Sequence, residues 1–103
     1  MDRIAIEDAI VEVLKTIYDP EIPVDVFELG LIYDITVNDD ASVEIYMTLT
    51  SPNCPVAESM PKEVEDKVGE IPEVKSSKVT VVFDPPWDQN MMSDEAKLEL
   101  GFL

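Results

Sequence analysis

The sequence contains no histidine and only one cysteine, Cys54, among its 103 residues. One thiol cannot form a disulfide within the chain, and without histidine it lacks the usual base of a cysteine nucleophile. An internal disulfide framework and Cys-His catalysis are therefore excluded. A free thiol fits a reducing compartment, so we expect a cytoplasmic protein.

The chain is also poor in basic residues and in long apolar runs. It has 7 Lys and Arg against 23 Asp and Glu, which gives a formal net charge of -16. Such a surface repels phosphate backbones, so we expect no nucleic-acid partner. No stretch approaches the roughly 20 apolar residues of a membrane span, and the acidic start does not resemble a signal peptide, so we expect no membrane association.

What the chain does contain is enough apolar material for a core. Hydrophobic residues make up 46% of the sequence against 29% charged residues, which favours one globular domain over residues 1–103. The excess of acidic residues has two interpretations. It either keeps a small domain in solution or attracts basic partners and cations.

Hydrophobic spacing predicts the elements of the first half. Apolar residues from Ile6 to Ile17 recur every three or four positions, as on a helix with one buried stripe, and the proline-containing segment 18–31 predicts an extended loop. Alternating residues predict a hairpin around a turn at 38–40, and a third strand later in the chain. The strands are expected at 32–37, 43–50 and 78–84, with one face carrying Tyr33, Ile35 and Val37, then Val43, Ile45, Met47 and Leu49, then Val79, Val81 and Phe83.

A second helix is predicted after Cys54. Pro55 suits a first helical turn, where the missing N–H has no partner to lose. Pro61 would kink a helix interior, so either the first turn is irregular or the regular helix begins only near Pro61. The residues that repeat every four positions are Val56, Met60, Val64 and Val68. A last short helix has Ser93 as N-cap and Gly101 as its stop.

The order helix, strand, strand, helix, strand, helix predicts an α+β two-layer sandwich with a small three-stranded mixed sheet. The strands on either side of the middle helix must run in the same direction, so both end at one edge of the sheet. Three irregular segments, 19–30, 50–55 and 84–87, are therefore expected to meet there. The residues expected to line this site are Asp19, Glu21, Thr50, Ser51, Asn53, Asp84 and Trp87.

Cys54 has two readings within this site. A thiol at a helix N-terminus has its pKa lowered by the helix dipole, although nearby carboxylates oppose this effect. A free cysteine is also often buried as a small hydrophobe. The polar, proline-rich surroundings of Cys54 favour exposure.

Other residues of the site also have structural alternatives. Trp87 is either a packing lid over the end of the sheet or a partner contact. Asp19 and Glu21 are either turn formers or ligands. Met91 and Met92 cannot both face inward from one helix, so we expect them to mark a partner-binding surface.

Three segments of the chain resemble the signature blocks of a known family. They are DPEIPVDVFELGLIYDI, MTLTSPNCPVAESM and FDPPWDQNMMSDEAKLELGF, within a resemblance that runs from Ile10 to Leu103. The family is the small iron-sulfur cluster assembly domain of SufT- and PaaD-type bacterial proteins and of the related eukaryotic cytosolic factor. The resemblance implies a helix, two strands, a helix and a strand, and a role in maturing iron-sulfur clusters on recipient proteins.

The resemblance also carries residues over. The cysteine of the family falls on Cys54, its acidic turn on Asp19-Pro20-Glu21, and its strand-terminating block on Asp84-Pro85-Pro86-Trp87. Two departures are Pro61, within the usual helix, and Pro23, where glycine is common.

The cofactor expectation follows from ligand number. An iron-sulfur cluster usually takes four ligands, mostly thiolates, and one chain offers one. A homodimer with added thiols, or a hand-over complex with an apo client or an assembly protein, could complete the set. We therefore expect Cys54 to be a transient cluster or metal ligand of a non-enzymatic accessory factor. The alternatives are a cysteine-independent acidic adaptor and a thiol peroxidase, which needs only a lowered thiol pKa.

Overall fold

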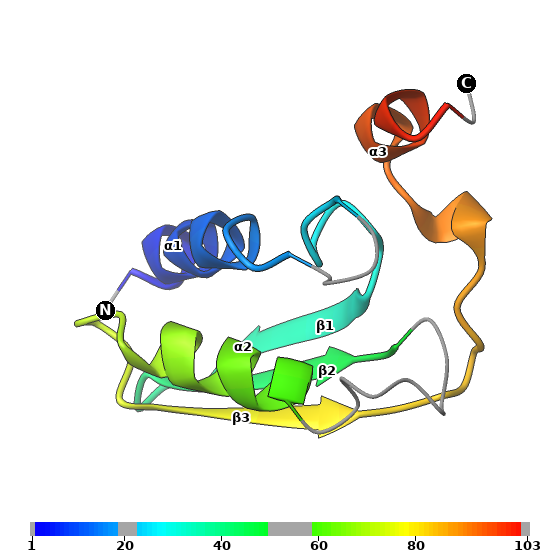
Figure 1. Cartoon of the computed structure of the whole chain (residues 1–103). Helices are drawn as coiled ribbons and strands as arrows, with labels where there is room; N and C mark the ends of the chain where they lie inside the picture. Colours follow the sequence, from blue (N-terminus) through cyan, green and yellow to red (C-terminus); the bar gives the residue numbers. More distant parts are fainter. Residues whose placement is uncertain (1, 19–22, 50–58, 102–103) are drawn as a thin grey trace.

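The computed structural model describes residues 2–18, 23–49 and 59–101 (Figure 1). The elements in these ranges are α1 (Arg3–Leu14), β1 (Ile32–Val37), β2 (Ser42–Met47), α2 (Ser59–Gly69), β3 (Ser76–Val81), the 3-10 helix η2 (Gln89–Met91) and α3 (Asp94–Glu99). Their order confirms the α+β class predicted from the sequence, with η2 as an addition.

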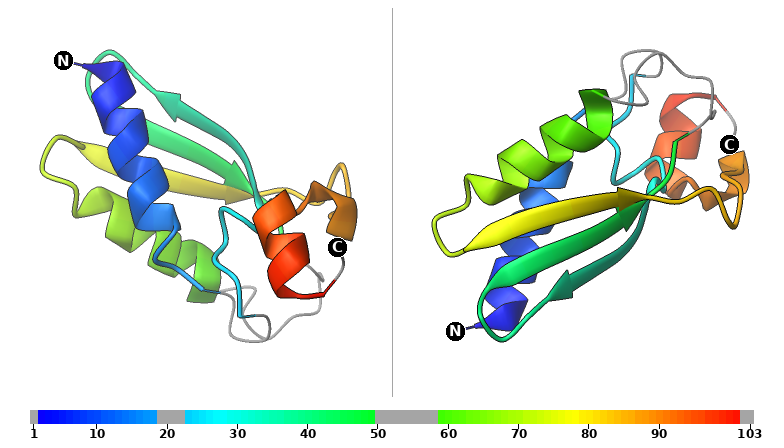
Figure 2. Two further views of the ribbon diagram at one scale, coloured as in Figure 1. Left: turned by 90° about the horizontal axis from the view of Figure 1, so that it is seen from above. Right: turned by 90° about the horizontal axis from the view of Figure 1, so that it is seen from below.

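The strands form one mixed sheet in the order β1-β2-β3. β1 pairs antiparallel with β2, and β2 pairs parallel with β3, as the crossover through α2 requires. Figure 2 shows α1 and α2 together on one face of this sheet. The architecture is therefore the expected two-layer sandwich.

The core lies between the two helices and the facing side of the sheet. The side chain of Asp2 caps α1 by accepting the Ala5 N–H at 3.1 Å, which sets the register of the helix stripe. The apolar side chains between the helices and the sheet are removed from water, and this hydrophobic effect makes the largest contribution to holding the two layers together. The buried residues from these elements are Ile6, Ile10 and Leu14 of α1, Val37 of β1, Val43, Ile45 and Met47 of β2, and Met60, Val64 and Val68 of α2.

Two predicted strand faces are wrong in detail. The register of β1 shifts between Ile32 and Asp34, so Tyr33 is the extra residue of a bulge and leaves the core face. β3 ends at Val81, and Phe83 beyond it is 47% exposed rather than packed. Alternation alone cannot reveal an extra residue or the point where pairing stops.

Pro61 does not interrupt the interior of α2, because it lies near the start of the helix. It is the third residue of α2, in the first turn, where backbone N–H groups have no acceptor within the helix. The helix therefore loses no hydrogen bond at Pro61. Val56, predicted to belong to the same apolar stripe, lies outside the described residues.

The outer edge of β3 is protected by α2. The carboxylate of Glu65 accepts the backbone N–H of Val79 at 3.1 Å, and the Ser77 hydroxyl donates to the Glu65 carbonyl at 2.5 Å. Unpaired donors on an edge strand invite pairing with another chain. Glu65 thus satisfies a donor of β3 and fixes α2 along this edge.

Replacement of Glu65 tests this edge contact. Glu65→Ala should lower the free energy of unfolding by about 1–2 kcal/mol, because the Val79 N–H loses its acceptor. Glu65→Gln keeps an acceptor oxygen and should retain most of the stability. Urea unfolding of both variants measures the difference, and equal losses would show that charge rather than hydrogen bonding matters at this position.

Candidate functional site

The carboxyl ends of β2 and β3 lie at one end of the sheet, where two irregular segments meet (Figure 2). We call this region the loop edge and define it as residues 23–31, 48–49 and 82–93. The backbone carbonyl of Leu31 accepts the Thr48 N–H at 2.8 Å, and the backbone carbonyl of Glu28 accepts the Ser93 N–H at 2.8 Å. The Trp87 indole N–H also donates to the Leu29 carbonyl at 2.8 Å, so the described parts of the predicted segments 19–30 and 84–87 meet as expected. The third segment, 50–55, lies outside the described residues.

The first loop of this region is built around a buried acid. Asp25 is 8% exposed, and one carboxylate oxygen accepts the N–H groups of Phe27 and Glu28 at 3.1 and 3.0 Å. These bonds are short-range and use the carboxylate to close a turn. Asp25 is therefore a structural acid of the loop edge.

Gly30 is a point of close approach between the two segments. Its φ is +79°, in the left-handed region, and a Cβ built there would overlap the Met91 carbonyl. Glycine is needed at this position both for the backbone angle and for the close approach. The contact seats η2 directly against the first loop.

Trp87 and Tyr33 attach the C-terminal segment to the rest of the fold. The Trp87 indole N–H donates to the Leu29 carbonyl at 2.8 Å, and the half-buried ring packs on the core. The Tyr33 hydroxyl donates to the Pro85 carbonyl at 2.7 Å and lies 3.5 Å from the Met91 sulfur. The bulge in β1 turns Tyr33 toward this segment, away from the core.

The predicted site residues separate into two groups. Asp84 is exposed beyond the end of β3, and Trp87 packs against the core at the loop edge. Met91 is 36% exposed, but Met92 is 5% exposed and belongs to the core, which corrects the expected surface role of Met92. The residues outside the described part of the chain are Asp19, Glu21, Thr50, Ser51, Asn53 and Cys54.

Sequence reasoning missed three residues that build the loop edge. Alternation along the strand places Tyr33 on the core face, the sequence pattern does not single out Asp25, and it identifies Gly30 only as part of a loop. The position of Gly30 at the end of a loop, just before a predicted strand, is a sequence signal of a turn with an unusual backbone angle. The role of Tyr33 had no sequence signal, because it depends on the bulge in β1.

The described side chains offer no resident metal site. Within residues 2–18, 23–49 and 59–101, no three His, Cys, Asp or Glu side chains are grouped to hold a metal ion. The whole chain has one cysteine, so it cannot supply four thiolates to a cluster. One copy of the chain therefore does not fit a resident cluster held by four thiolates. No helix in the described ranges is long and apolar enough to cross a membrane.

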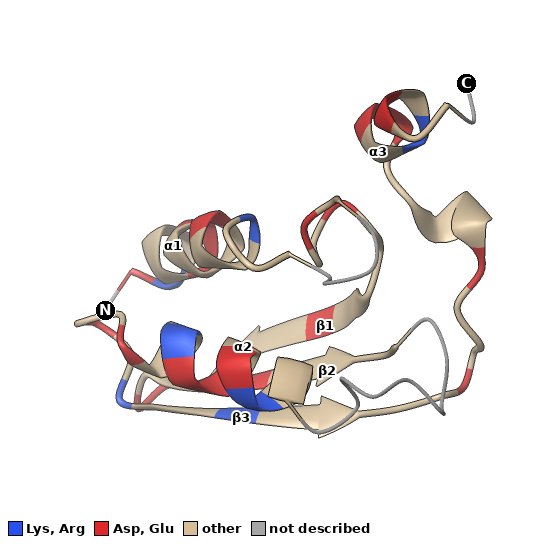
Figure 3. Ribbon diagram, in the orientation of Figure 1, with Lys and Arg blue, Asp and Glu red and all other residues tan. Residues whose placement is uncertain are grey.

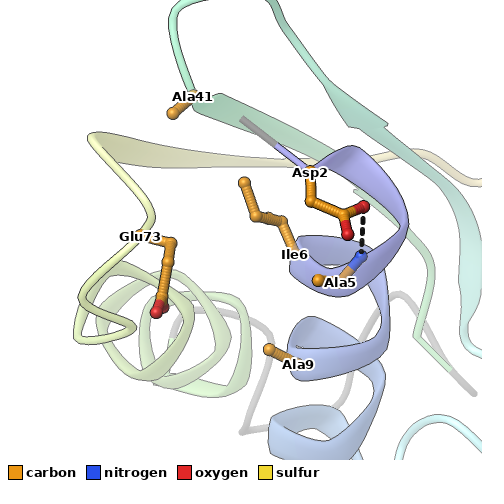
Figure 4. Close-up of a pocket in the computed structure, with 6 residues that line it drawn as sticks. All are labelled: Asp2, Ala5, Ile6, Ala9, Ala41 and Glu73. Carbon is orange, nitrogen blue, oxygen red and sulfur yellow. Dashed lines mark hydrogen bonds between the residues drawn. The ribbon is translucent and has the colours of Figure 1, made fainter.

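A cavity of about 400 Å³ lies at the opposite end of the molecule (Figure 4). Its apolar wall comes from the first turns of α1, and its rim comes from the β1–β2 turn and the loop after α2. The Asp2 carboxylate is already used in capping α1. The lining residues are Asp2, Ala5, Ile6, Ala9, Ala41 and Glu73. The lining has no thiol, hydroxyl or imidazole group, and the cavity is separate from the loop edge.

A pair of glycine variants tests the close contact in the loop edge. Gly30→Ala should lower the free energy of unfolding by about 3 kcal/mol, because it adds overlap with Met91 to the strain of a positive φ. Gly101→Ala is the matched control, since Gly101 also has a positive φ but open space around it, and should cost about 1 kcal/mol. Urea unfolding followed by the fluorescence of Trp87 measures both, and equal costs would contradict the contact.

Comparison with known proteins identifies the family of this chain. The model of the family described as iron-sulfur cluster assembly protein matches residues 7–81. A Porphyromonas gingivalis protein named Fe-S protein maturation auxiliary factor is 52% identical, over 94% of this chain and 92% of its own. The Staphylococcus aureus Fe-S protein maturation auxiliary factor SufT is 40% identical, over 82% of this chain and 97% of its own.

A solved structure agrees with these matches. A domain of unknown function from Bacillus anthracis superimposes with a TM-score of 0.88 at 38% identity, over 96% of this chain and 94% of that one. Sequence and architecture therefore agree over nearly the full length, which confirms the resemblance described above. The chain belongs to the iron-sulfur cluster assembly protein family.

Proposed function

We propose that this chain is a non-enzymatic accessory factor that helps to assemble iron-sulfur clusters or deliver them to client proteins, with Cys54 as a transient ligand of the cluster. The observation that carries the proposal is the near full-length match to proteins named Fe-S protein maturation auxiliary factors. The matched family segment, residues 7–81, includes Cys54. The cluster is cargo in this scheme.

The chemistry of the ligand set supports a shared cluster. One thiolate per chain leaves three positions to be filled by thiols of a client, an assembly protein, a second copy or a small molecule. A ligand set divided in this way suits transfer, because no single chain holds the cluster with all of its bonds. The lack of histidine also removes the usual base for cysteine catalysis.

The described residues on either side of the segment that carries Cys54 support this role. The chain enters that segment at Leu49, which is 3% exposed, and leaves it at Ser59, the first residue of α2. Leu49 belongs to the loop edge, where Trp87, Tyr33 and Gly30 hold the C-terminal segment in place. A rigid frame of this kind suits the presentation of a ligand to another protein.

Replacement of the thiol tests the proposal. Cys54→Ala should abolish the cluster absorbance that wild type shows after anaerobic reconstitution with iron, sulfide and thiol. Cys54→Ala should also reduce the activation of an apo iron-sulfur client to the level without added chain, because the single thiolate that this chain can contribute has gone. Ile4→Ser, at an exposed site on α1, is the control and should behave as wild type.

Two outcomes would contradict the proposal in different ways. Client activation that survives Cys54→Ala would favour a cysteine-independent adaptor. Peroxide turnover by wild type that is lost in Cys54→Ala would favour a thiol peroxidase.

A further inference from the structure

The loop edge exposes a set of large apolar side chains that the core does not use. Phe83 is 47% exposed and Met91 is 36% exposed. Pro85 and Pro86 between them are also exposed, and Tyr33 points its hydroxyl at Pro85. We call the apolar rim the exposed Phe83, Pro85, Pro86 and Met91 together with the half-buried Tyr33 of β1 beside them. Clustered apolar side chains on a small domain mark interaction surfaces more often than single exposed ones do.

The apolar rim is held in place by contacts within the chain. The Tyr33 hydroxyl joins β1 to Pro85 at 2.7 Å, and the Met91 N–H donates to the Asp88 carbonyl at 2.8 Å. The Met91 backbone also rests against Gly30. Phe83 is two residues from Pro85, so its backbone lies within about 7 Å of the backbone of Pro85, which Tyr33 holds in place. A surface formed before binding loses little conformational entropy when a partner arrives.

The charges around the apolar rim have one sign. Asp34 follows Tyr33, Asp84 follows Phe83, and Asp88 lies just before η2. Residues 79–96 contain no Lys or Arg. Figure 3 shows only acidic charges along the connection between the end of β3 and η2.

The basic residues of the chain do not neutralise these acids. Among the described residues, the ion pairs are Arg3–Asp39, Lys15–Glu28, Lys62–Asp66, Lys67–Glu63 and Lys75–Asp40. None involves Asp34, Asp84 or Asp88. The negative potential beside the apolar rim is therefore available to a partner.

We infer that the apolar rim binds a cationic amphipathic segment of a partner protein, in which an apolar or aromatic anchor is flanked by Lys or Arg. The apolar residues of this segment would pack on Phe83 and on Met91, while its basic residues pair with Asp34 and Asp84 or stack on the Tyr33 ring. A second copy of the chain fits poorly, since each copy carries a formal charge of -16. This inference rests on the proposed function in which the chain works through protein contacts.

Three short peptides separate the contributions to binding. The first alternates Lys or Arg with Leu or Phe, the second replaces every basic residue with Glu, and the third replaces every apolar residue with Ser at equal charge. Amide chemical shifts of the full chain should move at Tyr33, Phe83 and Met91 with the first peptide. The third should bind about tenfold more weakly, because it lacks the anchor, and the second should not bind.

Surface variants then locate the site. Phe83→Ser and Met91→Ser should each weaken the first peptide about fivefold or more, whereas Ile4→Ser, exposed at the far end of the molecule, should leave binding unchanged. Asp84→Asn should weaken binding and reduce its dependence on salt, because one steering charge is gone. All four positions are exposed, so these variants should fold, and thermal unfolding checks this.

Three results would overturn the inference. These are equal binding of the first and third peptides, tight binding of the acidic peptide, and unchanged binding in both Phe83→Ser and Met91→Ser. Cys54→Ala should bind the first peptide as wild type does. Loss of client activation with peptide binding intact, or the reverse, therefore distinguishes failure of the proposed function from failure of this inference.

Discussion

The parallel pairing of β2 with β3 determines how the remaining segments of the chain are placed. Parallel strands cannot be joined by a tight turn, so the chain must return through α2 before it enters β3. Both strands then end at the same side of the sheet, and the segments that follow them are delivered to one place. The antiparallel partner β1 begins at that side too, which brings the loop before it into the same region.

A few contacts to the backbone hold the converging segments together. The Trp87 indole, the Tyr33 hydroxyl and the approach of Met91 to Gly30 each join the C-terminal segment to an element far away in sequence. The segment contributes Met92 and Ala96 to the core and leaves Phe83 and Met91 exposed. The same contacts therefore both secure the tail and present apolar side chains to solvent.

The charge balance is consistent with a role in protein contacts at this edge. Five of the seven basic residues form ion pairs within the described part of the chain. Exposed pairs of this kind add little stability, but they remove positive charge from the surface potential. The acids beside the apolar rim lack such pairs, so a partner would meet negative charge around an apolar centre.

The class of fold, the element order and the family could be predicted from the amino-acid sequence. Helical spacing in α1 and α2 and alternation in β2 are local properties, because they depend on which side of one element meets the core. The crossover rule then gives the strand directions without any coordinates. The single thiol and the absence of histidine limit the chemistry before any fold is known.

Only the tertiary structure decided which side chains face the loop edge. The bulge at Tyr33 changes a side chain from core to surface, and it depends on pairing with β2, which no count along one strand reveals. Met92 becomes a core residue because η2 and the Ser93–Glu28 hydrogen bond turn the chain back onto the first loop. Gly30 could be read as a turn residue, but its contact with Met91 depends on a segment distant in sequence. These features arise from contacts between elements, and such contacts form only when the sheet and its helices are packed together.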